Sequence, residues 1–466
     1  MDCCRCMIQE GDNMKRRTSI RMTEGTIWKQ LLLFSMPLFV GNVFQLLYNT
    51  VDAAVVGNYV GSEALAAVGS TGSIINMVIC FSLGLSAGGS VVISQYFGAR
   101  DWDKLHISVH TTVVMTALLS VVLSLVSVPA VPMMLLAMST PEDVFPLAES
   151  YLKIYFSGLT GLLMYNAGAS ILRAVGDSTW PLIFLILSTL LNLALDLVFV
   201  VKVGMGVEGV AYATILSQYI SAILCFVLLF RTRQECRVRW REMRVHMATL
   251  KLILKIGIPT AVQQVLTSFS NVFVQGHINV FGADCMAGWT SYAKVDAFAQ
   301  MPNQSLSLAA STFVGQNIGA EQMDRAKKGV NVTMMLSMGI TFVLTAAVMI
   351  LANPLLKLFN QDPEVLEFGR LFVLLLSPFY LVAVVNTTYA SALRGAGDTK
   401  APMYILLGSY VLFRQLYLMV VSALTDSVVW VAMSYPAGWA MASIILTVYY
   451  RRSDWNRKRV GIHNPS

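Results

Sequence analysis

The chain has 466 residues, of which 56% are apolar and only 13% are charged, and its mean hydropathy is +0.64. A water-soluble globular protein cannot bury so large an apolar fraction, so the composition excludes that class and favours an integral membrane protein. The formal net charge of +7 does not indicate nucleic-acid binding, because the basic clusters lie in the loops where membrane topology places them.

Twelve apolar stretches follow one another along the chain, each near or above the roughly 20 residues that a helix needs to cross a bilayer. They lie at 28–57, 66–97, 108–138, 148–172, 180–202, 207–230, 250–281, 286–315, 328–352, 366–393, 402–424 and 428–450. This pattern predicts an all-α integral membrane protein with twelve transmembrane helices and leaves no room for a soluble domain.

Three segments outside the spans are rich in basic residues: the N-terminal tail (1–26), the loop 231–249 and the C-terminal tail (451–466). An even number of spans places all three on one face of the membrane, and basic loops mark the cytoplasmic face. We therefore predict a multi-pass protein of the plasma (inner) membrane with both termini in the cytoplasm. The N-terminal tail also contains Cys3, Cys4 and Cys6, which lack a fourth ligand and are interpreted as part of a disordered segment.

The first span contains a proline and a line of polar residues. Pro37 removes a helical hydrogen bond and permits bending, either as a static kink or as a moving hinge. Further along, Gln45, Asn49 and Asp52 recur at helical spacing and share one face of the helix. Polar side chains at membrane depth are costly, so this face is predicted to point away from lipid.

The fifth and sixth spans contain polar residues at a similar depth. Asn192 and Asp196 are four residues apart and so share a face of span five, while Thr214 lies on span six. At about 1.5 Å per residue, Asp52, Asp196 and Thr214 fall within a few Å of one another along the membrane normal. Two carboxylates with amide and hydroxyl oxygens predict a proton or Na⁺ site, although a static hydrogen-bonded core is the alternative.

The second half of the chain repeats the first. Arg173 and Asp177 recur as Arg394 and Asp398, in both cases 221 residues further on, and Gly61 returns as Gly282 at the same offset. Each copy holds six spans, an even number, so the repeat is parallel and its axis lies along the membrane normal. We predict two pseudo-symmetric six-helix bundles, the first at 27–230 and the second at 250–450, joined by the linker 231–249. Two such halves are typical of a transporter.

The second copy does not keep the acidic site. At the repeat offset, Asn192 becomes Phe413, Asp196 becomes Tyr417 and Thr214 becomes Tyr435. The second half offers Lys294, Asp296 and Arg414 instead. Lys294 and Arg414 are candidates for contact with an anionic part of a substrate; the alternative is that they pair with Asp296 and with carbonyl groups.

Several chemistries have no motif in the sequence. It contains no phosphate-binding Gly-x-x-x-x-Gly-Lys-Ser/Thr, no His-Glu-x-x-His and no nucleophile elbow, and its five histidines show no ligand spacing. We therefore expect that the protein is not an enzyme, needs no cofactor and draws its energy from an ion gradient.

Over residues 25–450 the chain resembles the multidrug and toxic compound extrusion (MATE) family. The resemblance rests on the segment from Pro37 to Asp52, on the Arg173–Asp177 motif, on Asn192 with Asp196, and on their second-half echoes. It implies twelve helices in two lobes, alternating access, and export of organic compounds in exchange for H⁺ or Na⁺. Because the acids lie on spans one and five, the chain looks DinF-like. That branch implies that Gln45 and Thr214 accompany the cation site. Asn166 on span four is a further candidate, either at this site or for contact with the substrate.

These observations together predict a monomeric antiporter for small organic compounds, embedded in the lipid bilayer and without a nucleic-acid partner. The alternative function is a flippase for a lipid-linked glycan, which shares the superfamily architecture. A flippase of that kind predicts a strongly cationic cavity, whereas the polar residues of the first half are acidic.

Overall fold

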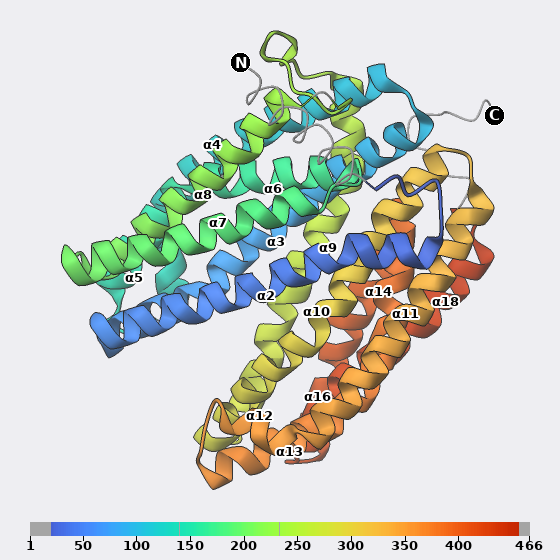
Figure 1. Ribbon diagram of the computed structural model, residues 1–466. Helices are drawn as coiled ribbons and strands as arrows, with labels where there is room; N and C mark the ends of the chain where they lie inside the picture. The colour runs from blue at the N-terminus through green and yellow to red at the C-terminus, as the bar shows by residue number, and fades with distance from the viewer. Residues whose placement is uncertain (1–19, 139, 233, 456–466) are drawn as a thin grey trace. The chain divides into compact units, whose positions relative to one another are not determined.

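The structure is a computed structural model that describes residues 20–138, 140–232 and 234–455 (Figure 1). Cys3, Cys4, Cys6 and the side chain of Asn49 lie outside the described residues. Within those ranges the regular secondary structure is helical throughout. The first half contains α2 (Ile27–Tyr59), α3 (Ser62–Ala99), α4 (Trp102–Ala137), α5 (Phe145–Ser157), α6 (Leu159–Ala174), α7 (Thr179–Asp196), the π-helix η1 (Leu197–Lys202) and α8 (Gly206–Arg231).

The second half follows the same order after the short 3₁₀ turn η2 (Trp240–Glu242). It contains α9 (Met247–Asn279), α10 (Ala283–Gly319), α11 (Met323–Ile350), α12 (Ala352–Lys357), α13 (Pro363–Leu376), η3 (Ser377–Phe379), α14 (Tyr380–Gly395), α15 (Lys400–Leu407), the π-helix η4 (Gly408–Phe413), α16 (Arg414–Leu424), α17 (Val428–Ala432) and α18 (Ser434–Arg452).

Ten helical stretches of the described chain are long and apolar enough to cross a membrane. The other two predicted spans correspond to α5 with α6, which are separate shorter helices because the chain breaks at Gly158, and to α10, which carries more polar residues. The predicted all-α architecture of twelve membrane helices in a twofold repeat is therefore confirmed.

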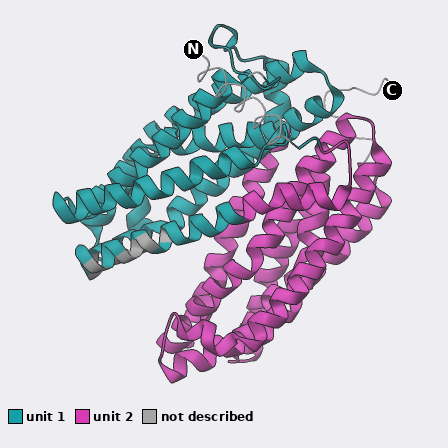
Figure 2. Ribbon diagram, viewed as in Figure 1, with its two compact units in different colours: residues 1–21, 40–255 teal, residues 22–39, 256–466 magenta. Residues whose placement is uncertain are grey.

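The chain clusters into two compact units (Figure 2). Unit 1 comprises residues 1–21 and 40–255, and unit 2 comprises residues 22–39 and 256–466. Both divisions fall inside long helices, α2 and α9, close to Pro37 and Pro259. The predicted lobe boundaries, 27–230 and 250–450, stay a prediction.

The repeat extends to the backbone conformation of its glycines. Gly61 and Gly282 precede α3 and α10 with φ of 120° and 100°, and Gly176 and Gly397 have φ of 93° and 89°. These values are accessible at little cost only to glycine, which explains why glycine stands at both members of each pair. The turn hydrogen bonds match as well: the amide of Asp177 donates to Leu172 O and that of Asp398 to Leu393 O, both at 2.9 Å.

In unit 1, α6 packs against α3, α4 and α8, and α7 packs against α8. Close approach of α6 to α8 depends on two glycines: a Cβ at Gly161 would lie 3.0 Å from the amide nitrogen of Tyr219, and one at Gly168 would lie 2.6 Å from Cys225 Sγ. Small residues at helix contacts are the usual means of close packing in membranes, where lipid gives helices no hydrophobic reason to associate. This packing fixes the helices that carry the polar residues of unit 1.

In unit 2, α10 packs against α11, α13 and α14, and α14 packs against α18. The segment that leads into α2 joins this unit through Arg325 on α11, whose guanidinium donates to the carbonyls of Glu24 at 3.0 Å and Gly25 at 2.9 Å. The amide of the fully buried Met22 donates to Gln316 Oε1 at 3.0 Å. These bonds explain why residues 22–39 cluster with unit 2 although they come first in the chain.

Candidate cation-binding site

The polar residues of unit 1 meet where α2, α7 and α8 lie together. Asp196, Asn192 and Thr214 are 0%, 1% and 4% exposed, and Asp52 is partly buried. Tyr48, one turn before Asp52 on α2, donates its hydroxyl to Thr214 Oγ1 at 3.2 Å and so ties α2 to α8. The predicted shared depth of spans one and six therefore corresponds to a direct contact.

Asp52 and Asp196 face each other within hydrogen-bonding reach. Both oxygens of Asp196 and Oδ1 of Asp52 are shielded from solvent and receive no hydrogen bond from the described residues, and the same holds for the amide oxygen and nitrogen of Asn192. Carboxylate oxygens only accept hydrogen bonds, so two that face each other need a proton or a cation between them. The Asp52–Asp196 pair is therefore a candidate site for binding a proton or a cation.

The oxygen donors at this point suit a hard ion. Carboxylate, amide and hydroxyl oxygens are the ligands that Na⁺ and similar cations take, and a carboxylate pair can equally hold a proton. The described residues contain no group of three or more His, Cys, Asp or Glu side chains that could hold a metal ion. The residues therefore fit H⁺ or Na⁺ better than a transition metal, which prefers imidazole and thiolate.

Asp196 is the last residue of α7 before the chain widens into the π-helix η1. A π-helical turn inserts one extra residue and is frequently found at functional sites. No feature of the apolar segment Leu197–Lys202 indicates this turn, and the sequence predicts one regular helix over the whole span.

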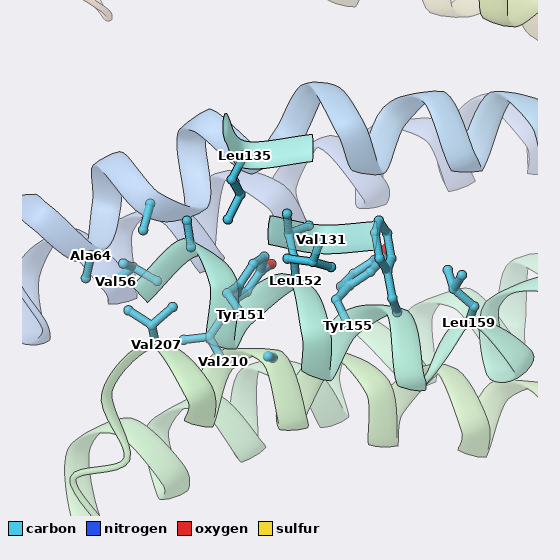
Figure 3. Packing of buried hydrophobic residues seen from close by; sticks show 14 of the residues in the cluster. Val56, Ala64, Val131, Leu135, Tyr151, Leu152, Tyr155, Leu159, Val207 and Val210 are labelled. Atoms are coloured by element: carbon cyan, nitrogen blue, oxygen red, sulfur yellow. The ribbon is translucent and has the colours of Figure 1, made fainter. Parts of the chain in front are cut away.

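Three tyrosines interact with the carboxylates, and none of them was predicted from the sequence. Tyr48 and Tyr155 interact electrostatically with Asp52, and Tyr151 interacts with both Asp52 and Asp196. Tyr151 and Tyr155 stand on α5, with ring centroids 6.2 Å apart, in the buried core of unit 1 (Figure 3). The available signal was their spacing of four residues, which places both on one face of a helix.

For the remaining residues predicted for this site, the structure gives only their exposure and hydrogen bonds. Gln45 is exposed. Asn166 on α6 is buried, and its amide donates to Ser82 Oγ at 3.5 Å. The side chain of Asn49 is among those not described.

Lys294 and Arg414 in unit 2 form no ion pair with Asp296 among the described residues, although such pairing was the alternative to contact with a substrate. Arg414 is 3% exposed, and its Nη2 donates to Ser270 Oγ at 2.7 Å and to Asn271 Oδ1 at 2.8 Å. Lys294 is exposed, with Nζ 5.1 Å from the centroid of the Phe359 ring. Asp296 interacts instead with Tyr380 and Gln300. Of the ion pairs found between described residues, none joins Lys294 or Arg414 to Asp296.

Comparison with known proteins defines the class as a membrane transporter. The sequence profile of the MatE family matches residues 37–198 and 259–419, one match in each copy of the repeat, and the chain belongs to this family. The resemblance noted from the sequence is thereby confirmed.

Relatives cover almost the whole chain. The probable multidrug resistance protein YoeA of Bacillus subtilis is 29% identical over 94% of this chain and 96% of its own length. The probable multidrug resistance protein YpnP of the same organism is 28% identical over 94% and 98%. A solved structure described as the outward-facing conformation of a multidrug resistance MATE family transporter superimposes with a TM-score of 0.87 at 22% identity, covering 93% of this chain and 97% of its own.

Proposed function

We propose that the protein is a secondary active exporter of small organic compounds that exchanges its substrate for H⁺ or Na⁺, with Asp52 and Asp196 as the coupling pair. The observation that carries this proposal is the meeting of two carboxylates whose buried oxygens lack donors among the described residues. The printed names of the relatives, multidrug resistance proteins, support an organic substrate.

The coupling follows from linkage. Occupation of the pair by a cation removes the repulsion between the carboxylates and stabilises one arrangement of α2 against α7 and α8. If the substrate binds the other arrangement better, each ligand weakens the affinity for the other by the same factor. A coupling of 1–3 kcal/mol, about 5- to 150-fold in affinity, is the usual range for such reciprocal effects.

The glycan flippase is the weaker alternative. It calls for a basic site for phosphate, whereas the ionisable residues at the unit 1 site are two aspartates enclosed by tyrosine hydroxyls. We therefore keep the exporter as the single proposed function.

The test is ethidium efflux from energised cells that express the wild type, Asp52→Asn or Asp196→Asn at matched levels. We expect both substitutions to abolish the efflux that depends on the ion gradient, because an amide cannot release a proton and holds Na⁺ less well. Asp103→Asn, an exposed acid in the first turn of α4, is the matched control and should transport normally. Normal efflux in both site variants would refute the proposed coupling pair.

A further inference from the structure

Arg414 in unit 2 is a buried cation, and the described residues give it no acidic partner. The residue is 3% exposed within a membrane span, and its Nε is shielded from solvent and meets no hydrogen-bond acceptor in the part of the chain that the structure describes. None of the ion pairs found in the described part of the chain includes it. A buried charge of this kind costs several kcal/mol and in membrane helices marks a functional position by default.

The neighbours of Arg414 are neutral and orient its guanidinium. Nη2 donates to Ser270 Oγ and Asn271 Oδ1 on α9, and Ser270 in turn donates to the carbonyl of Tyr410 at 2.8 Å. The ring of Tyr435 on α18 lies 4.8 Å from the guanidinium carbon. These contacts fix one edge and one face of the guanidinium, and they stabilise its charge only in part.

The repeat places this cluster in the position that the acidic site holds in unit 1. Arg414 directly follows the counterpart of Asn192, Tyr435 is the counterpart of Thr214, and Ser270 corresponds to Tyr48 at the offset of 222 that relates Pro37 to Pro259. Both clusters adjoin a π-helix, since η1 directly follows Asp196 and η4 directly precedes Arg414. The three equivalent spans therefore build a site of opposite charge in each unit.

We propose that Arg414 binds the anionic group of transported organic anions, a carboxylate, sulfonate or phosphate, and that unit 2 thereby adds organic anions to the compounds that the protein exports. Guanidinium forms charge-assisted hydrogen bonds with such groups, and the Nε hydrogen is available for one of them. The proposal rests on the proposed export function and names organic anions as one class of its substrates.

The test uses two dyes that share a xanthene ring system, the anion carboxyfluorescein and the cation rhodamine 123. Binding to the purified protein in phosphatidylcholine nanodiscs is followed by fluorescence anisotropy. We expect Arg414→Gln to weaken carboxyfluorescein binding by about 10-fold or more, which is the range for loss of a charged hydrogen bond, and Arg414→Lys to weaken it less. Rhodamine 123 binding should not weaken. Arg370→Gln, an exposed arginine on α13, is the matched control.

If Arg414 has only a structural role, the effects on dye binding and on Tm will differ from those given above. In that case Arg414→Gln lowers the Tm of the ligand-free protein and weakens the binding of both dyes alike, which would overturn the proposal. We expect the ligand-free Tm of Arg414→Gln to be unchanged or higher, because the substitution removes an unpaired buried charge. Failure of the wild type to bind carboxyfluorescein would also overturn the proposal.

Changing the lipid composition of the nanodisc distinguishes two sources of the anionic group, a lipid headgroup and a soluble organic anion. Competition by phosphatidylglycerol in the nanodisc would assign a lipid headgroup to Arg414, and lack of competition would assign a soluble organic anion; both outcomes support an anion site.

If Asp196→Asn abolishes coupled efflux while Arg414→Gln leaves carboxyfluorescein binding intact, the export function stands and this inference fails. If Arg414 controls anion binding but efflux never depends on an ion gradient, the inference stands and the coupling fails.

Discussion

At the scale of residues, the tyrosine hydroxyls decide how the carboxylate pair is held. Tyr48 bonds to Thr214 and stands one turn from Asp52, so it connects the coupling pair to α8. The proximity of Asp52 to Asp196 follows from the sequence because both acids lie at one depth and neither tolerates lipid. The tyrosines do not follow from it, since periodicity gives the face of a helix but not the neighbour that the face meets.

We predict that Tyr48→Phe lowers the rate of ethidium efflux by about 2- to 10-fold, the range expected for loss of one neutral hydrogen bond of about 0.5–1.5 kcal/mol. Thr214→Val should have a similar effect, and the double variant should be no worse than either single one because both remove the same bond. Tyr59→Phe, an exposed tyrosine at the end of the same helix, serves as the control. Fully additive effects of Tyr48→Phe and Thr214→Val would show that their hydrogen bond does not contribute to transport.

At the scale of elements, the departures from regular α-helix are what the sequence could not show. The π-helices η1 and η4 lie inside predicted spans, and the break at Gly158 separates α5 from α6 in the middle of another. In each case composition and hydropathy are those of an ordinary span, because the deviation is set by packing against neighbouring helices and not by local preference. The repeat of Gly61 as Gly282 is visible in the sequence, and the structure gives its reason, because both residues have a positive φ that favours glycine.

We propose that Pro37 acts as a moving hinge in α2. It stands in α2, two residues before the point at which the helix passes from unit 2 to unit 1. Pro37→Ala restores a backbone donor and removes a clash worth about 3 kcal/mol in a helix interior, so we expect a higher Tm. We expect slower ethidium efflux at the same time, because a straight α2 resists bending.

The control for Pro37 is Pro129→Ala in α4, where a proline also lies inside a long helix but away from the division between the two units. We expect this variant to gain Tm without loss of efflux. If Pro37→Ala transports as fast as the wild type, the proline is a static kink.

At the scale of the whole molecule, the sequence repeat was the main basis for predicting two six-helix bundles. Self-similarity at a fixed offset and twelve apolar stretches were sufficient for the class of fold, because a membrane permits few structures other than bundles of apolar helices. The division of α2 and α9 between the two units was not visible, because it depends on which neighbours each half of these helices contacts.

We further predict that both termini and the loop 231–249 face the cytoplasm, on the strength of their basic residues. Fusions of green fluorescent protein, which matures only in the cytoplasm, and of alkaline phosphatase, which is active only outside it, report the side of each terminus. Phosphatase activity of the C-terminal fusion would place the C-terminus outside the cytoplasm and contradict the predicted topology.

The central claim is that the Asp52–Asp196 pair couples export to an ion gradient. The most direct measurement is ethidium transport by the purified protein in liposomes on which a pH gradient or a Na⁺ gradient is imposed separately, with the wild type compared with Asp196→Asn. The account predicts that one of the two gradients accelerates transport by the wild type and that neither affects Asp196→Asn. An equal response of both proteins to the same gradient would contradict it.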